Sequence, residues 1–377
     1  MAFEESNRIK GIIFFILSCF IIIIGFSVTF QRFNIKNNTL AMDWKTFWPS
    51  IQGGKLIYIP LDGLRFPPWS MIPFIPLGYF SLKTSWGVLA GISVIISILS
   101  VPTSKNKIIY WLSIILLVLS YPSLRNLADG NMEAIVVGGI LLVLVGFRIK
   151  NPYVLTLGAL LGTIKLQEVT LLFLGIGILI IKKWDLAKWL KTGILFSLIV
   201  GLSLLWRGKE WFFALFGPNY AKYTSSIIDV SITGALSRLG FESLYLSLIL
   251  ILFVSISSLY IFLTNSTHIN RLKVGFLVAA SILVAPYAAG NSIFTVLSFG
   301  IIPYFQMNNI IGGFLIILVN LPFFLNQELI YNYSSYYWTI FLFFCWVLFG
   351  FTLLHRNNEF NSNSSEGKSP IEIEHIY

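Results

Sequence analysis

The residues best suited to chemistry begin in a stretch at positions 41–80, AMDWKTFWPSIQGGKLIYIPLDGLRFPPWSMIPFIPLGYF, which separates two strongly apolar runs. Asp43 stands there among Trp44, Phe47 and Trp48. Bulky aromatic side chains partly remove a carboxylate from water and raise its pKa, which makes it a stronger base. Asp is also a favoured residue at a helix N-cap. Asp43 is therefore either a general base or the cap of a helix over WKTFWPSI.

Three basic residues are candidates for contact with a phosphate group. Lys165, in GTIKLQEVTLLF, lies between two apolar runs, too deep for an ordinary loop lysine. It either forms a structural ion pair with Glu168, one helical turn away, or faces the phosphate of a lipid ligand. Arg65 and Arg125 are similar candidates, because a planar guanidinium suits phosphate oxygens in a bidentate way. For all three, a side chain that reaches the membrane interface is the plain alternative.

Two local structures are expected to position these candidates. After Asp43, the pair Gly53–Gly54 permits a tight turn, and Pro67–Pro68 fixes the chain as it returns to the membrane. The stretch therefore predicts a short interfacial helix, a turn and a rigid descent. Farther along, ADGNMEA is most simply a loop in which Asp129 or Asn131 caps the next helix.

The composition indicates whether these elements fold in water or in a membrane. Hydrophobic residues make up 56% of the 377 residues and charged residues only 11%. A soluble domain is about a quarter charged, so this chain belongs in a bilayer. The two cysteines lie inside apolar runs and the three histidines are scattered. We therefore expect no disulfide framework, no metal site and no cofactor.

We predict an all-α, polytopic membrane protein with about 12 transmembrane helices (range about 10–13). The apolar runs lie near 11–30, 84–101, 108–121, 132–147, 152–164, 168–181, 190–206, 242–264, 273–289, 292–306, 309–325 and 337–354. The first run is long enough to be a retained span rather than a cleaved signal peptide. The proline-rich stretch 68–81 is a re-entrant or interfacial piece. Gly87-x-x-x-Gly91 and Gly158-x-x-x-Gly162 predict close helix packing.

The basic residues predict the orientation of these spans. The net charge of +10 comes from bases dispersed between apolar runs, which indicates orientation in a membrane rather than binding to nucleic acid. With both termini in the cytoplasm, the bases gather in the inner connections, as in KKWDLAKWLK at 182–191. One transmembrane domain then covers 1–355, with outer loops at 31–67 and 207–240. The polar tail 356–377 is expected to be disordered and cytoplasmic.

Because successive spans cross the membrane in alternating directions, a set of charged residues is expected at the outer ends of spans. Charged groups at membrane depth cost about 2.5–3.5 kcal/mol on insertion scales and tend to be kept for function. We therefore predict a polar cavity that opens outward. The set is Asp43, Asp62, Arg65, Arg125, Asp129, Glu133, Lys165, Glu168 and Arg207.

Several motifs occur in an order that resembles a known family. They are FWPSIQGGKLIY after Asp43, then RFPPWSMIPFIPLG, GNMEAIVVGGILLVLVG, LGALLGTIKLQEVTLLFLG and LVAPYAAGNSIFTVL. Together they resemble the multispan, lipid-dependent glycosyltransferases of the GT-C type, and most of all family 87 (the DUF2029 group), related to polyprenol-phosphate-mannose α-1,2-mannosyltransferases. Three departures are Phe66 in place of Tyr, Leu166-Gln167 in place of Pro, and no His after Pro286.

The resemblance implies an inverting transfer of a hexose, mannose in the family, from a polyprenyl-phosphate donor to a hydroxyl acceptor outside the cytoplasm. The acceptor is a glycolipid, a glycan or a protein. Asp43 matches the position of the family's general base. Lys165, Arg65 and Arg125 are then candidates for the donor phosphate, and Asn131 and Glu168 for substrate binding. Tyr58 and Trp69 either stack on sugar faces or anchor the chain at the interface.

Other functions remain open on the sequence. A transporter or lipid flippase explains the span count and the broken helices, although it predicts internal repeats and midplane charges. A polymerase or ligase of surface polysaccharide also uses lipid-linked sugars, and its large late outer loop would correspond to 207–240. A non-catalytic scaffold needs none of the charged residues. Signatures of soluble enzymes such as G-x-S-x-G and H-E-x-x-H are absent.

Overall fold

The computed structural model describes residues 2–35, 40–58, 66–216, 228–241, 243–264, 269–325 and 327–365. Within these ranges the chain is helical, and the only strand-like pairing is an isolated bridge between Asp229 and Ala289. The longest helices are α1 (Ala2–Gln31), α4 (Leu82–Ser100), α9 (Leu166–Lys183), α10 (Leu186–Phe216), α13 (Leu244–Thr264) and α18 (Gln327–Ser365). The chain is therefore all-α over the described residues, as the apolar runs predict.

Shorter helices join and flank the long ones. They are α2 (Met42–Ile51), α3 (Pro68–Met71), α5 (Lys107–Val118), α6 (Tyr121–Asp129), α7 (Glu133–Arg148), α8 (Pro152–Gly162), α12 (Ile232–Arg238), α14 (Arg271–Val284), α15 (Ile293–Val296), α16 (Ile302–Met307) and α17 (Asn309–Asn320). Single turns of 3₁₀-helix lie at η2 (Gln52–Gly54), η4 (Thr163–Lys165), η5 (Gly290–Ser292) and η7 (Leu321–Phe324), a longer one at η3 (Ile72–Tyr79), and a π-helical turn at η6 (Leu297–Ile301). Over the described residues, the predicted apolar runs fall mainly on helices, although the run 273–289 extends five residues beyond the end of α14.

The number of spans is smaller than predicted when only long helices are counted. Among the described residues, six helical segments are long and apolar enough to cross a membrane, or seven if the bent pair α5–α6 is one span. The protein is therefore membrane-associated, but about 12 spans are not confirmed. α7 has 16 residues and α14 has 14, shorter than the roughly 20 that cross a bilayer. The run Pro152–Lys183 counts once, although it is broken around Lys165.

Two predicted boundaries also move. α10 continues to Phe216, ten residues into the outer loop expected to begin at 207, and α18 continues to Ser365, ten residues into the tail expected to be disordered from 356. Residues 366–377 lie outside the described residues. In both places, helix continues beyond the end of the apolar run.

Glycines allow the closest helix contacts. A Cβ on Gly158 would lie 2.5 Å from the backbone nitrogen of Val143, and one on Gly139 would lie 2.4 Å from the backbone nitrogen of Gly162. α7 and α8 therefore pack backbone to backbone. α1 and α4 do the same where a Cβ on Gly87 would lie 2.6 Å from Ser27 Cα. The close packing predicted from the small-residue spacing is confirmed.

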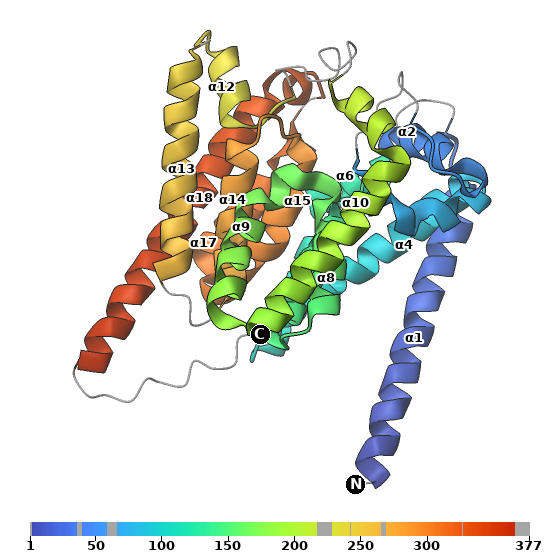
Figure 1. The fold of residues 1–377 in the computed structure, drawn as a ribbon, viewed down its shortest axis with the longest axis horizontal. Helices are drawn as coiled ribbons and strands as arrows, with labels where there is room; N and C mark the ends of the chain where they lie inside the picture. The colour runs from blue at the N-terminus through green and yellow to red at the C-terminus, as the bar shows by residue number, and fades with distance from the viewer. Residues whose placement is uncertain are drawn as a thin grey trace.

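The core centres on α14, where twelve of the fourteen residues are buried. α14 lies among α9, α13, α18 and η6 (Figure 1). The backbone of Leu171, early in α9, donates to Ser281 Oγ, late in α14, at 3.0 Å. α9 and α14 therefore run in opposite directions. The polar residues at the start of α9 and the basic residues at the start of α14 consequently lie at opposite ends of this helix pair.

Candidate functional site

Asp43 lies in the first turn of α2, which is tied to α6. The helix begins after Ala41, whose backbone is left-handed (φ 54°, ψ 32°) and whose N–H donates to Ala128 O at 2.7 Å. No side chain caps α2. Asp43 Oδ2 instead accepts a hydrogen bond from Asn131 Nδ2 at 2.6 Å. The cap interpretation of Asp43 is therefore wrong, because the helix starts two residues earlier and the carboxylate points to the α6–α7 junction.

Close packing holds this junction in place. Gly130 ends α6 with a φ of 69°, and a Cβ there would lie 2.5 Å from Trp44 Cβ. The indole nitrogen of Trp44 donates to Ser85 Oγ at 2.9 Å, and that of Trp86 donates to Leu127 O at 2.9 Å. Both rings are buried. The left-handed conformation and the close approach of Trp44 together require glycine at position 130.

The surroundings of Asp43 favour a stronger base. Its side chain is half-buried, and this burial raises the pKa of the carboxyl group above its ordinary value of 3.8. The positive charges of Lys165 and Arg125 and the hydrogen bond from Asn131 lower that pKa in part. Burial is the larger influence, in agreement with the aromatic residues around Asp43 in the sequence.

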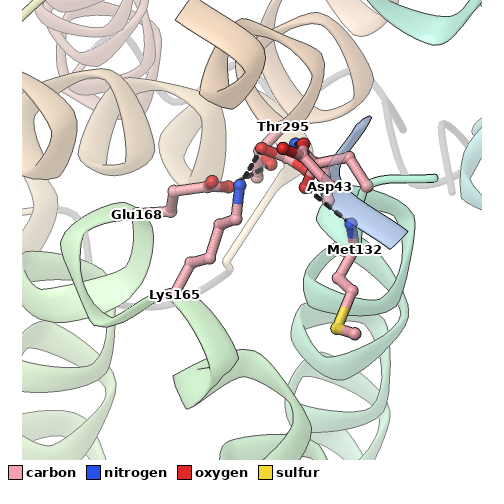
Figure 2. A network of polar contacts seen from close by, with 7 residues as sticks. Asp43, Met132, Lys165, Glu168 and Thr295 are labelled. Atoms are coloured by element: carbon pink, nitrogen blue, oxygen red, sulfur yellow. Dashed lines mark hydrogen bonds and ion pairs between the residues drawn. The ribbon is translucent and has the colours of Figure 1, made fainter. Parts of the chain in front are cut away.

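Lys165 pairs with a carboxylate that the sequence did not point to. Its Nζ forms a buried ion pair with Glu133 Oε1, and the side chain of Glu133 is fully buried. Glu168 was the expected partner, but its Oε2 accepts a hydrogen bond from Thr295 Oγ1 at 2.5 Å. Lys165 lies between the end of α8 and the start of α9, and Figure 2 shows its side chain directed toward Glu168 and Thr295. Lys165 therefore serves as counter-ion to a buried acid.

The segment ADGNMEA does not act as a capping loop. The N-cap of α7 is Met132, without a side-chain cap. Asn131 Oδ1 accepts from the backbone of Met132 at 2.6 Å, and its amide nitrogen donates to Asp43. Asp129 Oδ2 pairs with Arg125 Nη2 at 2.8 Å across one turn of α6. Asp129 and Asn131 thus belong to the polar cluster around Asp43.

We call Asp43, Arg125, Asp129, Asn131, Glu133, Lys165, Glu168 and Thr295 the polar cluster. Its residues come from α2, α6, the α6–α7 junction, α7, η4, α9 and α15, which the structure brings together. Four carboxyl groups face two cations, and each of those cations is paired with one of the carboxylates. The cluster is consequently more acidic than the sequence indicates, and its two cations are partly neutralised.

Several buried polar atoms of this region have no hydrogen-bond partner among the described residues. Buried polar atoms are nearly always paired with protein or with ordered water, so a group of such atoms indicates water or a polar ligand. They lie on α6 and α7, which meet at the polar cluster. The atoms are Asn126 Nδ2, Asn126 Oδ1, Asp129 Oδ1 and Glu133 Oε2.

Other candidate residues lie outside the polar cluster or outside the described residues. Tyr58 is buried and its hydroxyl donates to Phe66 O at 2.6 Å. Trp69 is 8% exposed, its nitrogen donates to Thr163 Oγ1 at 2.8 Å, and Trp211 packs edge-on against it. Both rings therefore pack within the protein. Arg207 pairs with Glu210 at 3.0 Å on α10, and Arg65 and Asp62 lie outside the described residues.

Sequence reasoning missed Thr295, Ser292 and Asn126. Thr295 stands inside the apolar run SIFTVL and Asn126 follows Arg125 in an amphipathic helix, so neither has a distinctive spacing. Glu133 was expected at the outer end of a span but not as a site residue. Glu133 could have been identified because it is an acidic residue at the start of an apolar helix, where a charged side chain needs a partner.

The arrangement combines a half-buried carboxylate, a paired cation at its side and a patch of buried hydrogen-bonding atoms. Within the described part of the chain, no three His, Cys, Asp or Glu side chains are placed to hold a metal ion. No family model, curated protein or solved structure matches the chain. Proton removal from a hydroxyl group held beside Asp43 is the chemistry that these side chains can perform.

Proposed function

We propose that the protein is a membrane glycosyltransferase of GT-C-like architecture that transfers a hexose from a polyprenyl-phosphate donor to a hydroxyl acceptor, with inversion. The observation that carries the proposal is the half-buried Asp43 carboxylate, held by Asn131 at 2.6 Å beside buried polar atoms without partners. A carboxylate with a raised pKa is suited to general-base catalysis. The resemblance of the sequence motifs supports mannose as the sugar.

In the proposed reaction, Asp43 removes one proton from the acceptor hydroxyl. The acceptor oxygen then forms a bond to the anomeric carbon as the bond from that carbon to the phosphate oxygen breaks. The phosphate leaves with the electron pair and is already an anion, so it needs cations rather than a proton. By analogy with inverting glycosidases, the sugar passes through an oxocarbenium-like transition state.

Arg125 is the better placed of the two described cations to meet the phosphate. Its side chain is 44% exposed, whereas that of Lys165 is 8% exposed and paired with Glu133. A guanidinium has five N–H donors, so Arg125 keeps Asp129 and still has donors for phosphate oxygens. We therefore propose Arg125 for donor contact and Lys165 for holding Glu133 and lowering the pKa of Asp43. Arg65 remains a candidate that the described residues do not test.

The buried atoms without partners support a substrate rich in hydroxyl groups. The amide of Asn126 can donate to and accept from sugar hydroxyls, and the carboxylate of Asp129 can accept from them. The cluster has four acids and two cations. This excess of acids favours neutral hydroxyl groups over any anion other than the donor phosphate. We propose that Asn131 and Glu168 take part in substrate binding through this patch.

The membrane delivers the donor in this proposal, so no nucleotide-binding domain is needed. We propose that the shorter helices complete a bundle of about 12 membrane segments, with α2 at the interface. The basic connections, such as Lys182 and Lys183 at the end of α9, lie at the opposite end of that helix from Glu168. On the basis of the positive-inside rule, we propose that both termini lie in the cytoplasm and that Asp43 lies on the outer side.

The test is Asp43→Asn in the purified full-length protein, assayed for sugar transfer from a polyprenyl-phosphate hexose. Loss of the base is expected to lower the rate about 10²–10⁴-fold, with the fold retained. Asp185→Asn is the matched control, because Asp185 is an exposed acid paired with Lys188 at 3.3 Å. Transfer by Asp43→Asn at the rate of the control would disprove the role of Asp43.

The pH dependence provides a second measurement on the same protein. Activity requires the ionised form of Asp43, so it is expected to fall as the pH drops through a pKa that lies above 3.8. Stability changes in the opposite direction. Because the folded pKa of Asp43 is raised, the folded state binds more protons in this window, and stability decreases as the pH rises through it. An acid limb that persists unchanged in Asp43→Asn would assign the titration to another group.

A transporter remains the second candidate, and one observation favours it. Glu133, Lys165 and Glu168 form a buried group of charges, and such groups mark ion or proton pathways in membrane proteins. Mass spectrometry of molecules that co-purify with the protein separates the two functions. A polyprenyl phosphate would support the transferase, and a small solute that the protein carries across vesicles would support the transporter.

A further inference from the structure

The side chain of Asn126, on α6, is a buried amide without a hydrogen-bond partner. It is 4% exposed, and neither its Nδ2 nor its Oδ1 has a partner among the described residues. An amide side chain has two N–H donors and an oxygen with two acceptor lone pairs. A buried polar group that stays unpaired costs the free energy of its desolvation. The amide of Asn126 is therefore unfavourable unless a ligand meets it.

Asp129 adds a second acceptor on the same face of α6. It follows Asn126 by three residues of the helix, and side chains at this spacing are neighbours on the helix surface. Asp129 Oδ2 pairs with Arg125 Nη2 at 2.8 Å, whereas Asp129 Oδ1 is buried and has no partner among the described residues. A ligand at this face thus meets one amide nitrogen and two acceptor oxygens.

Asn320, at the end of α17, shows how an amide next to the same helix is satisfied when it is structural. Its Oδ1 accepts from the backbone N–H of Tyr121, the first residue of α6, at 2.7 Å. Its Nδ2 donates to Ile316 O at 2.8 Å. Both ends of this amide therefore hold the backbone in place. The side chain of Asn126 forms no such bond within the described ranges, so its amide can serve a ligand.

The neighbours of Asn126 favour the sugar of the donor as that ligand. The backbone oxygen of Asn126 accepts from the N–H of Asn131 at 2.9 Å, and the side chain of Asn131 holds Asp43 at 2.6 Å. Arg125, directly before Asn126, is the proposed contact for the donor phosphate. Asn126 therefore lies between the proposed base and the proposed phosphate contact. In the proposed reaction the hexose occupies this place.

Building on the proposed transferase function, we propose that Asn126 and Asp129 bind one hydroxyl group of the transferred hexose, and that Asn126 sets the specificity for that hydroxyl. The amide N–H donates to the hydroxyl oxygen, and the carboxylate or the amide oxygen accepts the hydroxyl proton. A site built to bond a hydroxyl group rejects an analogue without it, because the buried polar groups of the site then stay unpaired. An anion would be repelled by Asp129, and an apolar chain would leave the amide unpaired.

The first measurement needs no substrate and uses the full-length protein in detergent. Asn126→Leu removes an unpaired buried amide at similar volume, so the unfolding midpoint should hold or rise by about 2 °C. Asn320→Leu is the matched control and should lower the midpoint, because it loses two hydrogen bonds. A fall in Asn126→Leu as large as in the control, repeated in Asn126→Ala, would make Asn126 a structural residue and overturn the proposal.

The second measurement tests specificity with polyprenyl-phosphate mannose and with analogues in which one hydroxyl at a time is replaced by hydrogen. The unaltered protein should prefer the parent donor over one of these analogues about 100-fold in kcat/KM. Asn126→Leu should lower this preference to less than about tenfold, whereas Asn320→Leu should keep it. Asn126→Ala is used if Asn126→Leu does not fold. The same preference in the unaltered protein and in the Asn126 variant would remove Asn126 from the sugar site.

Binding without transfer separates this proposal from the transferase function. With the acceptor withheld, the mannose donor should raise the unfolding midpoint of the unaltered protein and of Asp43→Asn, and raise it much less in Asn126→Leu. This pattern without transfer by the unaltered protein would disprove the transferase and keep the sugar subsite. Transfer by the unaltered protein, with an equal donor response in Asn126→Leu, would keep the transferase and disprove the subsite. No donor response in any variant, and no transfer, would disprove both.

Discussion

Asp43 and Asp229 are both withdrawn from solvent, but their carboxyl groups accept different hydrogen bonds. Burial raises the pKa of both carboxyl groups. Asp229 Oδ1 accepts two backbone hydrogen bonds, from Ser231 and Ala288, each at 3.0 Å. The described hydrogen bond of Asp43 comes from a side chain, Asn131, and involves only Oδ2.

The surroundings of Asp229 are those of a structural residue. Its backbone oxygen accepts from Arg238, and a Cβ on Gly234 would lie 2.5 Å from its carboxyl carbon. The bridge with Ala289 fixes this segment against the turn before η5. Asp229 thus joins two segments of chain with its hydrogen bonds. Asp43 is held less completely, so it has capacity for a substrate.

The largest effect is expected where charge is buried beside Asp43. Lys165→Met leaves Glu133, which is fully buried, without its counter-ion. Breaking a buried ion pair costs about 3–5 kcal/mol, whereas replacing both partners by apolar residues is nearly neutral. Lys165→Met should therefore lower the unfolding midpoint strongly, and Lys165→Met with Glu133→Leu should recover most of the loss. Equal destabilisation of the single and double variants would mean that the pair does not stabilise Glu133.

Alanine substitutions of the two aspartates are expected to have effects of intermediate size on the free energy of unfolding, and they compare Asp43 and Asp229 directly. Asp229→Ala removes the acceptor of two buried N–H groups and should cost about 3 kcal/mol of unfolding free energy. Asp43→Ala loses one hydrogen bond of a half-buried group and should cost about 1 kcal/mol. Denaturant unfolding of both variants in the same detergent measures the difference. If Asp43→Ala is the more destabilising, Asp43 is a structural residue and the comparison fails.

Much of the polar cluster could be predicted from the sequence, because membrane depth makes charged residues conspicuous. Asp43, Arg125, Lys165 and Glu168 were all assigned to one end of the spans, and the structure brings them together. The aromatic residues after Asp43 also predicted its partial burial. The positions of the long helices followed from the apolar runs, whereas α6 and α12 lie outside those runs.

The specific partners could not be predicted, for reasons of backbone geometry. The sequence offers Glu168, one helical turn away, as one of two partners for Lys165, but the backbone of Lys165 (φ −120°, ψ 85°) breaks the helix there. Its side chain therefore reaches Glu133 on α7, which is distant in sequence. Ala41 adopts a left-handed conformation and its N–H donates to Ala128 O, which no local pattern predicts. The span count was uncertain because apolar runs do not show which short helices cross the membrane.

The smallest effect on stability, and the sharpest test of phosphate contact, comes from Arg125→Lys. Its ion pair with Asp129 is part-exposed, and such pairs contribute about 0–1 kcal/mol, so the unfolding midpoint should hardly change. Lysine keeps the charge but loses the planar fork that binds phosphate in a bidentate way. The KM for the polyprenyl-phosphate donor should therefore rise about tenfold with kcat little changed. Arg207→Lys is the matched control, because Arg207 forms a similar pair with Glu210 on α10, outside the polar cluster. A KM that rises equally in both variants, or in neither, would remove Arg125 from the donor site and leave Asp43 without a cation for the leaving group among the exposed members of the cluster.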